Sequence, residues 1–363
     1  MRSVRGVLTV AVVVALSTVT LSARGAIDLT VELRQRYFGH ENVDPDTGAV
    51  RPDRVILSWF GVTNFAAAIA GHVVLLDAWV PRGEYSGYVP SSPGELAALQ
   101  PEAIFLGHGH FDHGADAAEI VERSGATVVG TPQHCAQVRS QVGLGVEVTC
   151  VEAADTDDEP GAVRELDTLD GVGITAVLHV HSAAENPDAE DPHTPTAPPP
   201  DADAVAFHLP APQDTIHLLS HLADAEGGTV LYQFRVGDFA LTWHDSSGPL
   251  KERAPHVFDV LSALPAPTDV QVGAIMGFNQ ITNGLRDPRM YVEALAPKVF
   301  VPSHHDNWAP GITTRAENYE PFVQEELDAV PPDKRPILRF IGDPQDYVRP
   351  EVLTFDLSSP FWS

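Results

Sequence analysis

The residues most able to do chemistry in this sequence lie close together in the stretch LGHGHFDHGAD, at positions 106–116. Three imidazoles and a carboxylate, from His108, His110, Asp112 and His113, fall within six positions. Neutral imidazole nitrogens and carboxylate oxygens are ligands that suit Zn²⁺ and also Fe or Mn. Burying these four groups without a metal would leave lone pairs unsatisfied, at a cost of several kcal/mol. The stretch therefore predicts a metal centre.

A strand and the loop after it must position these side chains. The run EAIFLGH at 102–108 predicts a buried strand, so alternate residues of the motif share a side and the turn brings the last pair around. Glycines at 107, 109 and 114 indicate tight backbone turns. A dinuclear centre needs more ligands than one loop provides, so the others must come from the ends of later strands.

Helices and strands alternate along the chain, which predicts an α/β fold. In the first half we expect strands at 55–59, 64–70, 72–80, 102–108, 126–130 and 146–151, and helices at 92–101, 114–125 and 131–143. The first of these helices has Ser92 as its N-cap and Pro93 in its first turn. In the second half we expect a strand at 171–181, a hairpin at 227–248 pivoting at Gly237 and Asp238, strands at 270–278 and 297–305, and a helix at 287–296.

No linker divides the chain, so we expect a single domain over residues 26–363 that carries one surface insertion at about 182–215. Proline and aspartate dominate this insertion, which predicts that it builds no packed element. Because it leaves the strand that carries His179 and His181, it is either a passive insertion or a lid.

The composition excludes some partners. With 22 basic and 50 acidic residues the net charge is −28, which disfavours nucleic acid and anionic membranes as partners. The 44% hydrophobic content is enough for a large core.

Residues 1–25 have the layout of a secretory signal peptide, with arginines, an apolar run and then small residues. We therefore expect a secreted or periplasmic protein without stable membrane insertion after leader removal. Cys135 and Cys150 either pair in that oxidising compartment, for about 3 kcal/mol of stability, or remain buried thiols.

Several segments together resemble the metallo-β-lactamase superfamily, and within it the branch around ascorbate-6-phosphate lactonase and related metal-dependent hydrolases. The resemblance covers most of the mature chain and rests on LSWFGVTNF and LLDAW, GHGHFDHGAD, WHDSSG and VPSHHDNW. Flavodiiron members carry an acidic residue where this sequence has His110, so the hydrolytic pattern fits better than the redox one. The resemblance implies a four-layer αββα sandwich.

The resemblance also implies a set of ligands for two metal ions. The first ion is expected on His108, His110 and His181, the second on Asp112, His113 and His304, and Asp245 is expected to bridge them. His179 is the alternative to His181, and His305 the alternative to His304. His217 and His221 compete for the third ligand position. The usual GDT of the family is HDS here, which identifies Asp245 but not the roles of its neighbours.

The activity implied is hydrolysis of a small molecule by an exported enzyme. Two divalent ions, with Zn²⁺ preferred and Fe or Mn as alternatives, would share a bridging hydroxide that cleaves a lactone, ester or phosphoester. Asp112 is expected to orient the water or take its proton. The alternatives are a metal-dependent binding or sensing protein without turnover, and a β-lactamase.

The sequence leaves the substrate undefined. The aromatic and amide residues next to the motif strands either line the pocket or belong to the core; they are Trp59, Phe60, Trp79, Phe278, Asn279 and Trp308. Arg286 and Arg289 either meet an anionic substrate or pair with carboxylates.

Overall fold

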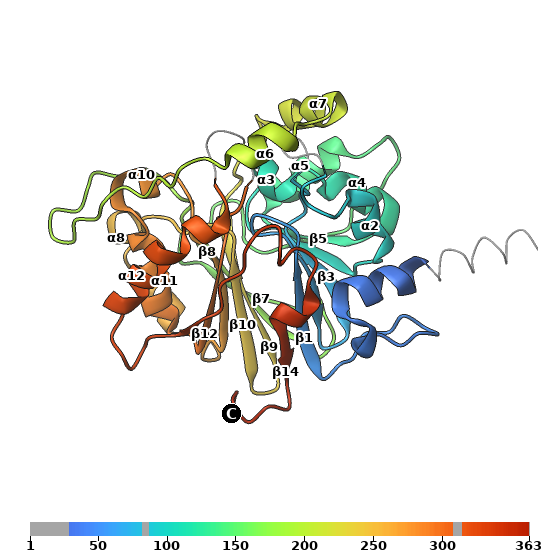
Figure 1. Cartoon of the computed structure of the whole chain (residues 1–363). Helices are drawn as coiled ribbons and strands as arrows, with labels where there is room; N and C mark the ends of the chain where they lie inside the picture. The colour runs from blue at the N-terminus through green and yellow to red at the C-terminus, as the bar shows by residue number, and fades with distance from the viewer. Residues whose placement is uncertain (1–28, 82–86, 308–313, 363) are drawn as a thin grey trace, which may run out of the picture.

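The computed structural model describes residues 29–81, 87–307 and 314–362, so the predicted leader and Trp308 lie outside the described residues. Two seven-stranded sheets form the centre of the molecule (Figure 1). In spatial order the first sheet consists of β14 (Thr354–Asp356), β1 (Arg54–Trp59), β2 (Phe65–Ile69), β3 (His72–Leu76), β4 (Ala103–Phe105), β5 (Thr127–Gly130) and β6 (Cys150–Glu152). The second consists of β13 (Ile337–Leu338), β12 (Val299–Ser303), β11 (Val270–Ala274), β10 (Phe239–His244), β9 (Thr229–Val236), β8 (Gly173–His179) and β7 (Val163–Leu166).

Each sheet is half antiparallel and half parallel. Strands β1, β2 and β3 form an antiparallel meander, after which β4, β5 and β6 run parallel to β3. In the second sheet β7, β8, β9 and β10 are antiparallel neighbours, and β11, β12 and β13 run parallel to β10. The expected meander and hairpin are confirmed, and the hairpin turns at Gly237, which has a φ of 57°.

One hydrophobic core fills the space between the sheets, because the facing strands are apolar on their inner faces. Phe105 of the first sheet lies edge-on to Tyr232 and Phe234 of the second, with ring centroids 5.3 and 5.0 Å apart. The Tyr232 hydroxyl donates to the carbonyl of Leu106 at 3.0 Å, just before the histidine motif. The second sheet therefore helps to hold the motif of the first.

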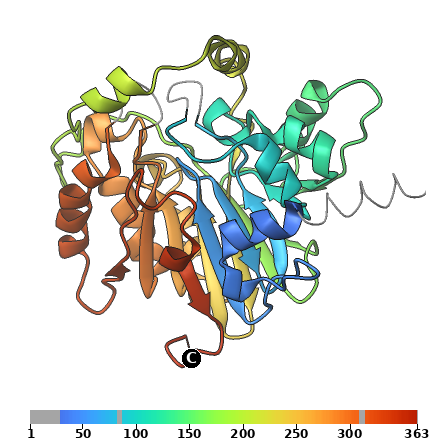
Figure 2. The same ribbon diagram turned by 45° about the vertical axis from the view of Figure 1, so that its right-hand side comes forward.

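Helices cover both outer faces and complete the αββα sandwich, which confirms the predicted fold class (Figures 1 and 2). The first sheet is covered by α2 (Pro93–Ala98), α4 (Ala117–Ser124) and α5 (Pro132–Gln141). The other face carries α8 (Leu250–Arg253), α9 (Val257–Ser262), α11 (Arg286–Leu295) and α12 (Glu320–Ala329). As expected, the Ser92 side chain accepts from the Glu95 amide at 3.2 Å, and Gly125 ends α4 with a φ of 74°.

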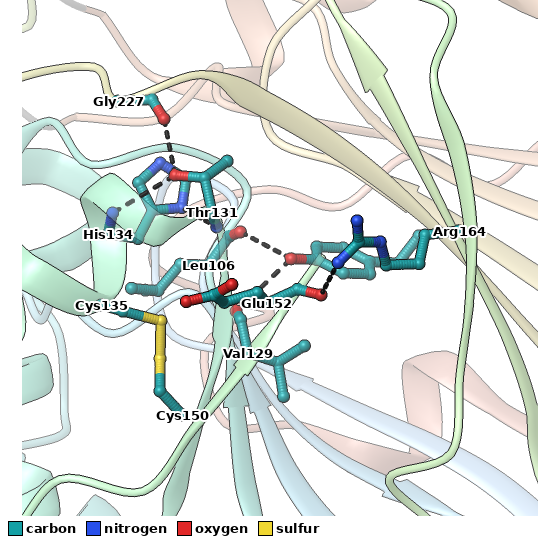
Figure 3. Close-up of a disulfide and its surroundings, with 10 residues drawn as sticks. Leu106, Val129, Thr131, His134, Cys135, Cys150, Glu152, Arg164 and Gly227 are labelled. Atoms are coloured by element: carbon teal, nitrogen blue, oxygen red, sulfur yellow. Dashed lines mark hydrogen bonds between the residues drawn. A yellow bond between two sulfur atoms is a disulfide. The ribbon is translucent and has the colours of Figure 1, made fainter. Parts of the chain in front are cut away.

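A disulfide ties α5 to the edge strand β6 (Figure 3). It joins Cys135 to Cys150, with the two Cα atoms 6.1 Å apart. Of the two alternatives that the sequence left open, the structure takes the pair. Thr131 caps the same helix, because its hydroxyl accepts from the His134 amide at 3.2 Å. The start of α5 is thus fixed from two sides.

The insertion at 182–215 differs from the prediction in one respect. It lies on the surface, but it also contains α6 (Ala202–Phe207) and the beginning of α7 (Pro212–His221). Proline is compatible with the first turn of a helix, where its missing N–H costs nothing, so Pro212 starts α7 instead of preventing a helix. No helix in the described part of the chain combines the length and the apolar character needed to cross a bilayer.

Candidate metal centre

The predicted ligands gather at one edge of the two sheets, where strands end. The motif follows β4 and includes α3 (Phe111–Gly114), while His181 lies two residues beyond β8. Asp245 directly follows β10, and His304 directly follows β12. Strands β8, β10 and β12 run in the same direction, so their carboxyl ends meet at the same edge.

Three imidazoles form a first group of potential ligands. The Nε2 of His108 lies 3.0 Å from the Nδ1 of His110. The His181 ring centroid is 4.5 Å from that of His108 and 4.8 Å from that of His110. One nitrogen of each residue can reach a common ion, since the three atoms lie within 4.8 Å of one another.

A second group lies directly beside the first. The Oδ2 of Asp112 is 3.4 Å from the Nε2 of His113 and 3.2 Å from the Nε2 of His304. Asp245 lies between the groups, with its Oδ2 2.7 Å from the Nδ1 of His108 and 3.3 Å from the Nδ1 of His113. The structure thus brings together all seven residues of the main predicted set.

Asp77 belongs to this centre and was missed from the sequence. Its Oδ2 lies 2.7 Å from the Nδ1 of His113 and accepts from the Thr63 hydroxyl at 2.7 Å, while its Oδ1 accepts from the Gly107 amide at 3.0 Å. Burial and the nearby Asp245 raise the pKa of Asp77 to about 7. The sequence feature that could have identified Asp77 is its position, because, like Asp245, it directly follows a buried strand.

The buried atoms of the centre fit a metal ion. Neither the Oδ1 of Asp245 nor the Nε2 of His113 has a hydrogen-bond partner, although both atoms are buried. Leaving such atoms without a partner costs about 1–3 kcal/mol each. Imidazole nitrogens and carboxylate oxygens together are a donor set that a transition metal would satisfy.

The electrostatics of the cluster separate its imidazoles into two kinds. Burial lowers the pKa of His108 well below its usual range, and burial with His110 nearby lowers the pKa of His181 to about 4. These imidazoles are neutral at pH 7, the form that binds metals. Burial would also lower the pKa of His113, but the carboxylates of Asp112, Asp77 and Asp245 outweigh it and raise that pKa well above its ordinary value.

One glycine of the motif is required because a side chain packs directly against its backbone. A Cβ on Gly107 would lie 2.1 Å from the Cγ of Asp245, so only glycine lets that carboxylate reach the backbone of the motif. In addition, three non-glycine residues around the centre have left-handed backbone. They are Val62, Asp77 and His304, with φ angles of 52°, 57° and 59°. Strain of this kind concentrates at functional sites.

The alternative ligands lie elsewhere. His179 is buried with its Nδ1 2.8 Å from the Tyr291 hydroxyl, and His305 is buried with its Nε2 2.9 Å from the Ile341 carbonyl. The Nε2 of His217 lies 3.0 Å from Asp116, and the Nδ1 of His221 lies 2.7 Å from Asp224. None of these four joins the candidate metal groups found among the described residues.

Helix α5 supports the motif loop from behind. The side-chain amide of Gln137 donates to the Gly109 carbonyl at 2.7 Å. The Gly109 amide in turn donates to the Glu226 carbonyl at 2.7 Å, and that carbonyl also lies 2.9 Å from the Nε2 of His134. The disulfide-tied helix therefore positions the loop that carries the first ligands.

A cavity of about 430 Å³ opens over the centre. Its lining consists of His108, His110, Phe111, Asp112, His113, His181, Ser182, Leu222, Asp224, Asp245, Ser246, Met276, Gly277, Phe278, Gln280, Ile281 and His304. Of the candidate pocket residues, Phe278 lines the cavity, whereas Trp59, Phe60, Trp79 and Asn279 are buried outside its lining.

The two arginines considered for an anionic substrate are engaged in ion pairs. Arg286 is fully buried and pairs with Glu252 at 2.8 Å and with Asp287 at 2.6 Å. Arg289 pairs with Glu326 at 3.0 Å and also with Asp191 of the insertion. Neither residue lines the cavity.

No family model matches the chain. A UPF0173 metal-dependent hydrolase of Methanopyrus kandleri is 24% identical over 269 residues, which cover 74% of this chain and 91% of that protein. One of Pyrobaculum neutrophilum is 37% identical over 75 residues, 21% of this chain and 32% of the relative, so this match spans only about a third of that relative. Among solved structures, Igni18, a metallo hydrolase of Ignicoccus hospitalis, matches with a TM-score of 0.50 and 17% identity over 79% of this chain and 95% of its own.

Proposed function

The chain has the metallo-β-lactamase fold, and from this premise we propose that it is a metal-dependent hydrolase whose centre binds two divalent ions, preferably Zn²⁺. The observation that carries the proposal is the convergence of two groups of ligands on one cavity, with Asp245 between them. When bound, such ions would polarise the scissile group and lower the pKa of a water molecule.

Different residues of the chain would bind the two ions, orient a ligand and orient the attacking water. His108, His110 and His181 would hold one ion, and Asp112, His113 and His304 the other. Asp77 would fix the orientation of His113 through the contact at Nδ1. Asp112 faces the cavity and would also orient the attacking water and accept its proton.

We propose a lactone or ester as the bond that is cleaved. Both cysteines of the chain are tied in the disulfide, so no thiol is available for covalent catalysis, and water is the nucleophile that the centre favours. The resemblance to the lactonase branch supports the same bond class. The substrate is a small molecule, because the cavity has the size that such ligands occupy.

Elemental analysis and a substrate panel test this function. We expect about two transition metal ions per chain and metal-dependent turnover in a screen of lactones, aryl esters, phosphodiesters and β-lactams. The His110→Ala variant should lose an ion and almost all turnover. The Asp112→Ala variant should have a much lower turnover rate than the parent but only a small change in stability. The exposed His40 provides the control His40→Ala, which should match the parent. Metal binding without turnover on any substrate would instead favour a binding or sensing protein.

We also propose that the protein is exported. The leader composition supports this, and so does the disulfide, since such bonds persist in oxidising compartments. Sequencing the N-terminus of protein recovered from the periplasm or medium should place it near residue 26. Full-length protein confined to the cytoplasm would contradict the proposal.

A further inference from the structure

We propose that the substrate is uncharged and carries an apolar group, which packs against Phe278, Ile281 and Leu222 at the mouth of the cavity. This inference rests on the proposed hydrolase function and narrows its substrate class. It starts from the apolar part of the cavity lining, which we call the apolar wall. Five side chains form it: Phe111, Leu222, Met276, Phe278 and Ile281.

Three of these side chains are unusually exposed. Phe278 is 62% exposed, Ile281 60% and Leu222 55%. Single exposed apolar residues are common on proteins, but three that line one cavity beside a metal centre mark a binding surface. An apolar group of the substrate would remove part of their surface from water and so contribute to binding.

The wall is held in place by the insertion. The short helix α10 (Gln280–Asn283) carries Ile281 and receives three hydrogen bonds from that segment. The Thr196 amide donates to the Gln280 carbonyl at 3.0 Å, the Glu185 amide to the Thr282 hydroxyl at 3.3 Å and the Asp188 amide to the Asn283 side chain at 3.2 Å. The insertion is therefore part of the pocket architecture.

Helix α7, which directly precedes Leu222, carries two more exposed apolar side chains. Ile216 and Leu219 are 68% and 61% exposed, and they lie three residues apart on the same face as Leu222. The opposite face carries His217 and His221, which contact Asp116 and Asp224. The helix thus presents Ile216, Leu219 and Leu222 to solvent, while Leu218 is buried on its inner side.

Away from the ligands, the described lining of the cavity offers no cationic side chain to pair with an anionic group of the substrate. The acidic lining residues are Asp112, Asp224 and Asp245, and none of the described lining residues is a lysine or arginine. Two bound divalent ions would outweigh the charges of Asp112 and Asp245, so an anionic group could be held at the ions themselves. Away from the ions the charged lining residue is Asp224, which contacts His221. Nearby Arg253 lines a neighbouring hollow but pairs with Glu185. A phosphate on the substrate would therefore meet no cationic side chain.

Acyl-chain length provides the first test. With phenyl acetate, butyrate and hexanoate, we expect kcat/KM to rise about fivefold for each added pair of methylenes, less than full burial would give. Phenyl phosphate and bis(4-nitrophenyl) phosphate should be poor substrates. Phe278→Ser and Ile281→Ser should each lower the hexanoate-to-acetate ratio at least twofold, and Phe278→Leu should restore it. The matched control is Leu144→Ser, at a fully exposed leucine that does not line the cavity, which should leave the ratio unchanged.

A binding measurement separates this inference from the hydrolase proposal. In metal-free protein the unreactive ketone 2-octanone should bind more tightly than 2-butanone, and Phe278→Ser should remove most of the difference. Metal-dependent turnover with equal rates along the ester series, equal ketone affinities, or a preference for phosphoesters would overturn the inference and leave the hydrolase standing. Lack of metal-dependent turnover on every substrate would overturn the hydrolase, and the substrate class with it.

Discussion

At the scale of single residues, the centre depends on groups that hold the ligands as well as on the ligands themselves. Asp77 contacts His113 through one carboxylate oxygen and the Gly107 amide through the other, so one side chain fixes both an imidazole and the backbone of the motif. Carboxylates that orient ligating histidines typically change metal affinity 10–100-fold when mutated.

We therefore expect Asp77→Asn to weaken metal binding by about 10–100-fold while the protein stays folded. Asparagine tolerates the left-handed backbone at this position and keeps an acceptor for the Gly107 amide. Competition with a chromophoric chelator measures the affinity, and circular dichroism checks the fold. An unchanged affinity would show that Asp77 does not position His113.

Gly107→Ala tests the close approach of Asp245. The new methyl group would lie 2.1 Å from the Asp245 Cγ, and both residues are buried, so we expect a loss of about 1–3 kcal/mol in the free energy of unfolding together with lost metal binding. Gly114→Ala in the same motif is the control, because its methyl group would meet nothing closer than 3.7 Å. Equal effects of the two substitutions, measured by urea unfolding and metal analysis, would refute this explanation.

At the scale of elements, α5 carries the structural support of the motif loop. The disulfide joins it to β6, and Gln137 links it to Gly109.

The double variant Cys135→Ala/Cys150→Ala should lose about 3 kcal/mol of unfolding free energy, because the unfolded chain regains the conformational freedom that the disulfide, across a 15-residue separation, denies it. Urea titration measures the loss. The parent protein in reductant should behave like the variant, and a variant as stable as the oxidised parent would contradict the prediction.

At the scale of the whole molecule, the centre joins the two sheets. The motif follows a strand of the first sheet, whereas His181, Asp245 and His304 follow strands of the second. Only the folded sandwich brings these candidate ligands together, so a bound metal ion would stabilise the native state by mass action. The sheets also share one core, which aligns their edges.

Removal of metal should therefore lower the stability of the parent protein. With free Zn²⁺ at about 100 times its Kd, we expect about 2.7 kcal/mol of added stability, which a chelator removes and added Zn²⁺ restores. Thermal or urea unfolding measures the difference. His110→Ala should show a much smaller metal-dependent shift, and a shift equal to that of the parent would place the ion elsewhere.

The sequence by itself predicted an α/β fold, the hairpin at Gly237 and the residues His108 to His113, because strand and helix periodicities and a local motif are properties of neighbouring residues. The αββα sandwich was implied by the family resemblance. The family resemblance added His181, Asp245 and His304. Only the tertiary structure decided that Asp77 contacts His113, that Arg286 and Arg289 are paired, and that the insertion supports α10. Those contacts join residues far apart along the chain, and packing, which no local pattern encodes, determines which of them meet.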